Sequence, residues 1–98
     1  MSATRRWVDA FADEMESRLD SNRHKGDRAG WSRESPHWLM KCLLMECAEL
    51  YGAICDADSH EYSVPGDLKA VRSEAADVAN FALMVADVAG GLKLKRRA

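Results

Sequence analysis

Apolar side chains recur at helical spacing along three segments of this chain, and two turn-rich breaks separate the segments. The breaks cover residues 21–35 and 56–66, where Gly, Pro, Asn, Asp and Ser gather. Strands are not indicated, because β-branched residues are few. In addition, apolar residues do not alternate with polar ones. A length of 98 residues suits one domain. The sequence predicts an all-α protein, a small bundle of three main helices in a single domain over residues 1–98, with a basic tail at 92–98.

The three helices are expected over residues 3–20, 36–57 and 67–90. Ser35 is the expected N-cap of the second helix, because the proline that follows it suits the first helical position. Gly90 and Gly91 end the third helix, since glycine readily adopts the left-handed conformation that closes a helix. Within the first helix, Glu14 and Arg18 stand four residues apart, a spacing at which they can form an ion pair.

Charge and composition exclude several classes of protein. A net charge of −2 gives no whole-domain basic surface for nucleic acid. No apolar run reaches the roughly 18 residues that a membrane helix needs, and the N-terminal segment does not read as a secretory signal. The spacing of the three cysteines matches no zinc-binding motif, and their odd number fits a reducing compartment. We therefore expect a cytoplasmic protein, and 47% hydrophobic residues in so short a chain favour a homo-oligomer.

Two glutamates stand inside apolar arcs of the predicted helices. On a wheel of ~100° per residue, Glu46 lies within ~40° of several apolar residues of the second helix. Glu74 has the same position on the third helix. Three residues further along each helix, Glu49 and Asp77 occupy matching positions at the edge of the arc. Two acid-x-x-acid pairs thus carry the same orientation toward the core.

Four carboxylates converging on a core need compensation. A buried, unpaired carboxylate costs several kcal/mol, so such groups are protonated or bind a cation. An all-oxygen donor set suits Mg²⁺ or Mn²⁺. One acidic pair alone is more often a solvated helix face. A di-iron site needs two Glu-x-x-His motifs, whereas the chain offers one, Glu34 to His37, interrupted by proline.

At these residues the chain resembles the MazG-like all-α nucleoside triphosphate pyrophosphatases. Their signature, E-x-x-E followed at a distance by E-x-x-D, is met by Glu46–Glu49 and by Glu74–Asp77. The segment from Asp77 to Asp87 is similar to that of the short phage-type dATP/dGTP pyrophosphohydrolases. Those enzymes carry a loop Asn-x-His-Lys-Gly-Gly-Trp. Here residues 22–26 and 30–31 read Asn-Arg-His-Lys-Gly and Gly-Trp, with residues 27–29 inserted between them.

The resemblance implies hydrolysis of dGTP, dATP or both to the nucleoside monophosphate and pyrophosphate. It implies two or more Mg²⁺ or Mn²⁺ ions per active site, and a homodimer or dimer of dimers, in the host cytoplasm if the protein is phage-encoded. The implied metal ligands are Glu46, Glu49, Glu74 and Asp77. The implied nucleotide-binding residues are Asn22, Lys25, Trp31 and Asn80, with Trp31 stacking on the base. Glu46 or Glu49 is the expected acceptor of the proton of the attacking water.

Other interpretations stay open at this point. The substrate could be a pyrimidine or damaged nucleotide. The chain could also be a non-catalytic helical oligomerisation module whose acidic pairs meet arginines at subunit seams. Asp87 either orients Lys25 or ends the third helix in solvent.

Overall fold

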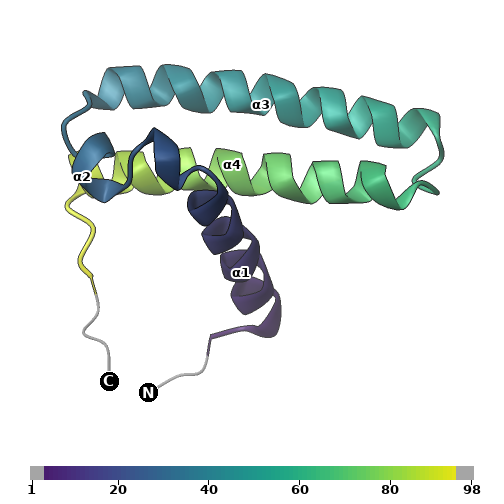
Figure 1. Ribbon diagram of the computed structural model, residues 1–98, viewed down its shortest axis with the longest axis horizontal. Coiled ribbons are helices and arrows are strands. Elements are labelled where there is room, and N and C mark those ends of the chain that lie inside the picture. The colour runs from purple at the N-terminus through teal and green to yellow at the C-terminus, as the bar shows by residue number, and fades with distance from the viewer. Residues whose placement is uncertain (1–3, 95–98) are drawn as a thin grey trace.

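The computed structural model describes residues 4–94, the side chain of His24 excepted. Every regular element in this range is helical: α1 (Arg6–Ser21), the 3₁₀ turn η1 (Arg23–Lys25), α2 (Arg28–Trp31), α3 (Pro36–Ser59) and α4 (Pro65–Gly90) (Figure 1). The long helices α3 and α4 pack side by side as an antiparallel hairpin, and α1 packs obliquely against α4 (Figure 1). The predicted all-α bundle of three main helices is thereby confirmed.

The signals for the ends of α3 and α4 act as expected. The Ser35 hydroxyl accepts a hydrogen bond from the backbone N–H of Trp38 at 3.1 Å, which caps α3. α3 runs slightly past its predicted end, to Ser59. α4 begins at Pro65 rather than at residue 67, because proline itself fits the first turn of a helix. Gly91 closes α4 with a φ of 63° in the left-handed region.

The start of α1 and the first break differ from the prediction. The predicted first residue, Ala3, lies outside the described residues, while Thr4 and Arg5 are not helical, so α1 begins later than expected. The break at residues 21–35 is not a plain loop, since it contains both η1 and α2. The inserted Asp27 caps α2, with its carboxylate accepting a hydrogen bond from the backbone N–H of Arg28.

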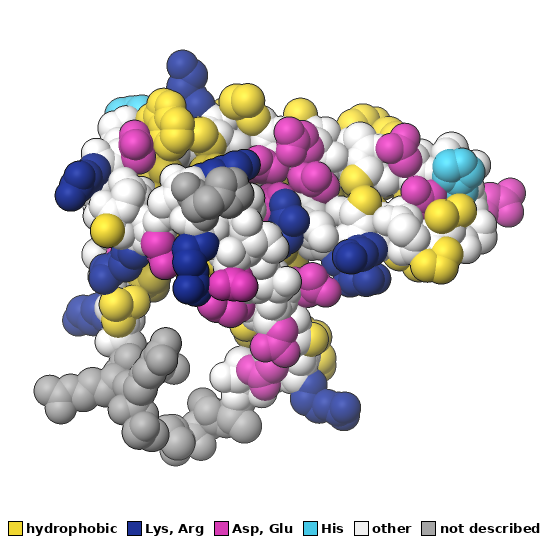
Figure 2. Space-filling view, in the orientation of Figure 1, with side chains coloured by type: hydrophobic (Ala, Val, Ile, Leu, Met, Phe, Trp, Pro, Cys, Tyr) yellow, Lys and Arg dark blue, Asp and Glu magenta, His cyan; other side chains and the backbone are white. Residues whose placement is uncertain are grey.

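The core is thin for a chain of this size. Leu39 and Ala57 of α3 and Ala76 of α4 are the fully buried apolar residues in the described part of the chain. Large apolar side chains on α1 and α3 are exposed, and Figure 2 shows hydrophobic atoms along the outer edge of α3. These side chains are Trp7, Val8, Phe11, Trp38, Met40, Leu44, Met45, Tyr51 and Ile54. The hairpin and α1 therefore present apolar faces to solvent.

No helix between residues 4 and 94 combines the length and the apolar character that crossing a membrane requires.

Candidate active site

A pocket of about 470 Å³ opens where α1, α3, α4 and the segment between α1 and α3 meet. Its wall combines carboxylates, cations and aromatic rings. Figure 2 shows acidic side chains gathered over the middle of the hairpin, with basic side chains beside them. All eight site residues expected from the sequence line this one pocket: Asn22, Lys25, Trp31, Glu46, Glu49, Glu74, Asp77 and Asn80.

Three of the four predicted carboxylates form a tight group. Glu46, Glu74 and Asp77 each present an oxygen within 4.8 Å of the others. Glu49 lines the same pocket but is exposed and outside this group. Glu49 and Asp77 hold matching positions on their wheels but differ in their surroundings, because α1 packs on α4 and its Arg18 covers Asp77. The Asp77 side chain is only 13% exposed as a result.

Burial leaves negative charge in this group poorly compensated. The Oε2 atoms of Glu46 and Glu74 are buried and find no hydrogen-bond partner among the described residues. Burial, then a hydrogen bond with Glu49 and the charges of Glu49, Asp77 and Glu74, together raise the pKa of Glu46 to about 7. Burial, followed by the charges of Glu49 and Asp77, also raises the pKa of Glu74. Two carboxylates thus lie at a site that favours either a proton or a cation.

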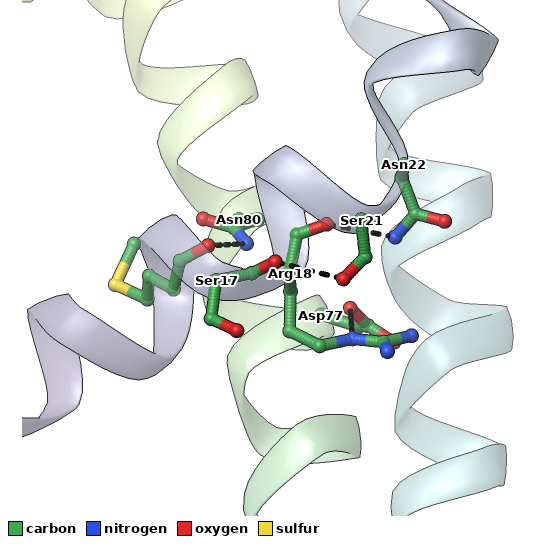
Figure 3. Close-up of polar contacts among 7 residues, drawn as sticks. Ser17, Arg18, Ser21, Asn22, Asp77 and Asn80 are labelled. Atoms are coloured by element: carbon green, nitrogen blue, oxygen red, sulfur yellow. Dashed lines mark hydrogen bonds and ion pairs between the residues drawn. The ribbon is translucent and has the colours of Figure 1, made fainter.

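The pocket contains one cation that the sequence analysis missed as a site residue. Arg18 reaches across from α1 and donates from Nε and Nη2 to the two carboxylate oxygens of Asp77, at 2.9 and 3.0 Å (Figure 3). The ion pair that the spacing of Glu14 and Arg18 allows is not formed, because Glu14 instead pairs with Arg72 of α4 at 3.5 Å. The wheel held a signal for this arginine: Arg18 lies only ~20° from Phe11, inside the apolar stripe of α1.

Two asparagines fix the end of α1 over the pocket. Asn22 donates from Nδ2 to the carbonyl oxygen of Arg18 at 3.0 Å and so ends the helix (Figure 3). Asn80, which is 4% exposed, donates from Nδ2 to the carbonyl oxygen of Met15 at 2.9 Å. Its Oδ1 is buried and has no protein hydrogen-bond partner within residues 4–94. Asn80 thus links α4 to α1 through its amide nitrogen, while its buried amide oxygen is left without a partner among the described residues.

Asp87 holds α2 against the end of α4. Arg28 donates to its two carboxylate oxygens at 2.8 and 2.9 Å, and the indole N–H of Trp31 donates at 3.1 Å. We call these three residues the Asp87 clasp. Hydrogen bonds from Arg28 and then Trp31 lower the pKa of Asp87 to about 2. Both earlier interpretations of Asp87 are wrong, since its partners are Arg28, one of the inserted residues, and Trp31.

The donor chemistry of the pocket fits a hard divalent cation. Carboxylate oxygens make up the converging group, and two of them lack partners in the part of the chain that the structure describes. Mg²⁺ and Mn²⁺ prefer such ligands. Glu46, Glu74 and Asp77 could together hold such an ion, with Glu49 beside them.

Comparison of the chain with family models, with curated proteins and with solved structures finds no match.

Proposed function

We propose that the chain is an Mg²⁺- or Mn²⁺-dependent nucleoside triphosphate pyrophosphohydrolase of the MazG-like type, acting on purine deoxynucleoside triphosphates (dGTP, dATP or both). One observation carries the proposal: residues from α1, α3, α4 and the intervening segment, chosen from the sequence for this chemistry, line a single pocket. Two buried carboxylate oxygens in that pocket lack partners among the described side chains. A volume of about 470 Å³ falls within the range of small-molecule sites.

The proposed metal-binding residues are Glu46, Glu49, Glu74 and Asp77, holding two or more ions per site. When bound, the cations offset the charge of the triphosphate and lower the pKa of the attacking water. Glu49 stands outside the converging group, so one of its carboxylate oxygens is free to take the proton of that water, and Glu46 is the alternative acceptor. The products are the nucleoside monophosphate and pyrophosphate.

The rest of the pocket supports the recognition of a nucleotide. Lys25 is exposed at the pocket wall and supplies positive charge for the phosphates and the leaving pyrophosphate. Trp31 is partly buried, and the Asp87 clasp holds its indole by the N–H, so its ring is fixed in position for stacking on a base. Asn22 at the end of α1, and Asn80 of α4, which contacts α1 at Met15, are the further residues proposed to hold the nucleotide.

A homo-oligomer, either a dimer or a dimer of dimers, belongs to the same proposal. Met40, Leu44 and Tyr51 recur at helical spacing on α3 and are exposed, as is Trp7 on α1. Contiguous exposed apolar faces of this kind commonly mark an interface. Light scattering on the purified protein is expected to give a multiple of 10.9 kDa. Replacing Leu44 with Glu is expected to lower that mass. The proposed substrate places the reaction in the cytoplasm.

The test is to incubate the purified protein with each deoxynucleoside triphosphate and Mg²⁺ and to separate the products by chromatography. Wild-type protein is expected to release pyrophosphate from the purine nucleotides, and Glu74→Gln is expected to release almost none. Glu16→Gln is the matched control, because Glu16 is an exposed glutamate on α1 outside the pocket. Pyrimidine or damaged nucleotides as better substrates would change the specificity. No release from any nucleotide would contradict the proposal and favour a non-catalytic module.

A further inference from the structure

Arg18 occupies the acidic group in a way that competes with a cation. Its guanidinium engages both carboxylate oxygens of Asp77, at 2.9 and 3.0 Å. Asp77 is also one of the three residues whose oxygens converge within 4.8 Å. The arginine fork occupies one lone-pair direction on each of these oxygens, and its positive charge repels a divalent cation at the same group. Arg18 therefore opposes cation binding for as long as it keeps both contacts with Asp77.

One arginine does not compensate the whole group. The pKa of Arg18 is raised first by its hydrogen bond to Asp77 and also by the charges of Asp77, Glu74 and Glu46, so the guanidinium lies in the field of all three carboxylates. Yet Glu46 Oε2 and Glu74 Oε2 accept no hydrogen bond from the groups that the structure describes. The buried Asn80 adds a further oxygen in the pocket without a partner in this range. Arg18 thus leaves part of the negative charge in the pocket uncompensated, which favours a ligand of higher positive charge.

Once displaced, the Arg18 side chain remains in the pocket. It is 32% exposed, on the last turns of α1, and it lines the pocket together with Lys25. The planar guanidinium fork matches phosphate oxygens as well as it matches a carboxylate. A triphosphate brought to this pocket carries about four negative charges that Lys25 alone does not offset. Arg18 is the second cation available to them.

We propose that Arg18 is a partner-exchanging residue: it neutralises Asp77 in the cation-free protein and turns to the phosphates of the nucleotide when divalent cations occupy the acidic group. This inference rests on the proposed function and adds a substrate-binding residue to it. It assigns Arg18 opposite effects on two ligands, since the arginine opposes the metal ion and favours the nucleotide.

The experiment measures the two ligands separately, without turnover. Calorimetry gives the affinity for Mn²⁺ alone. A second titration, at saturating Mn²⁺, gives the affinity for a dGTP analogue with a methylene group between its α and β phosphorus atoms. Arg18→Gln is expected to bind Mn²⁺ about fivefold more tightly and the analogue at least about tenfold more weakly. Arg18→Lys keeps the charge without the fork, so it is expected to lie between wild type and Arg18→Gln for the analogue.

Arg72→Gln is the matched control, because Arg72 also links α4 to α1, through Glu14, but lies outside the pocket. This variant is expected to bind both ligands as wild type does. Arg18→Gln binding Mn²⁺ no more tightly than wild type, or binding the analogue equally well, would overturn the exchange. A wild-type protein that binds neither ligand would instead overturn the proposed function, so the two failures are distinguishable.

Discussion

Asp77 and Asp87 lie on the same helix, and each accepts two hydrogen bonds from the fork of an arginine. Arg18 reaches Asp77 from α1, and Arg28 reaches Asp87 from α2. Both carboxylates are well covered, with side chains 13% and 6% exposed. Judged by these pairs alone, the two sites are alike. Their surroundings separate them.

Around Asp87 the polar groups are matched. Trp31 adds a third donor, and the pKa of Asp87 is lowered to about 2. Around Asp77, the neighbouring Glu46 and Glu74 each bury an oxygen without a partner in the described part of the protein, and the pKa of Glu46 is raised to about 7. A matched carboxylate holds structure together. An unmatched group of carboxylates is a candidate site for a ligand.

The same substitution at the two aspartates is expected to give the largest contrast. Asp77→Asn removes a proposed metal ligand and is expected to lower kcat for pyrophosphate release at least about a hundredfold. Asp87→Asn loosens the clasp that positions Trp31, so its effect is expected mainly in KM. Steady-state kinetics on both variants measures the difference. Equal losses of kcat at the two positions would remove the distinction between the sites.

Trp31 links the clasp to the pocket, and two substitutions separate its two contacts. Trp31→Ala removes ring and N–H together and is expected to raise KM for a purine nucleotide about tenfold, since stacking on a base contributes about 1–3 kcal/mol. Trp31→Phe keeps a ring but loses the hydrogen bond to Asp87, and it is expected to retain most of the affinity. If Trp31→Phe raises KM as much as Trp31→Ala does, the hydrogen bond to Asp87 rather than stacking on the base accounts for the effect.

Much of this comparison was accessible from the sequence. Ser35 and Gly91 marked helix ends through local chemistry, and Glu46 and Glu74 stood out because each lies on the apolar face of its own helix. What the wheels could not give is which helix covers which face. Glu49 and Asp77 look equivalent on their wheels, yet Asp77 is covered by α1 and Glu49 is exposed. Contacts between distant segments decide this, and a wheel treats each helix alone.

The partners of the two aspartates were missed for two different reasons. Arg18 lies on the apolar stripe of α1. A charged residue on an apolar face is the same signal on the helical wheel that indicated Glu46 and Glu74. Arg28 lies in an insertion between the two halves of the loop, where no periodic pattern indicates its partner. Its contact with Asp87 depends on α2 folding back on α4.

The stability of the cation-free protein is expected to fall as pH rises toward neutrality. Glu46 has a pKa of about 7 when folded and 4.5 as a reference, so between these values the folded state keeps a proton that the unfolded chain has lost. The contribution is therefore full below pH 4.5 and is lost as pH rises through 7. We expect a loss on the order of 1–2 kcal/mol, discounted for partial exposure. Denaturant titration in EDTA measures it.

Asp87 is expected to change the stability of the fold with pH in the opposite direction. Its pKa is lowered from 3.8 to about 2, so its contribution is present above pH 3.8 and is lost as pH falls through 2. Glu46→Gln is expected to flatten the change near neutrality and to leave the acid limb in place, whereas Asp87→Asn is expected to do the reverse. Because the pKa of Glu74 is raised as well, a part of the loss is expected to remain in Glu46→Gln, and a loss that is undiminished in this variant would contradict the assignment.

Thermal unfolding at increasing Mn²⁺ is the most direct test of the proposal that the unmatched carboxylates bind a divalent cation. A ligand bound only by the folded state stabilises it by about 2.7 kcal/mol at a hundred times its Kd. The unfolding midpoint is therefore expected to rise with Mn²⁺ in wild type and in Asp87→Asn, and to stay constant in Glu74→Gln. A wild-type midpoint that does not move with Mn²⁺, or one that rises equally in Glu74→Gln, would contradict cation binding by these carboxylates.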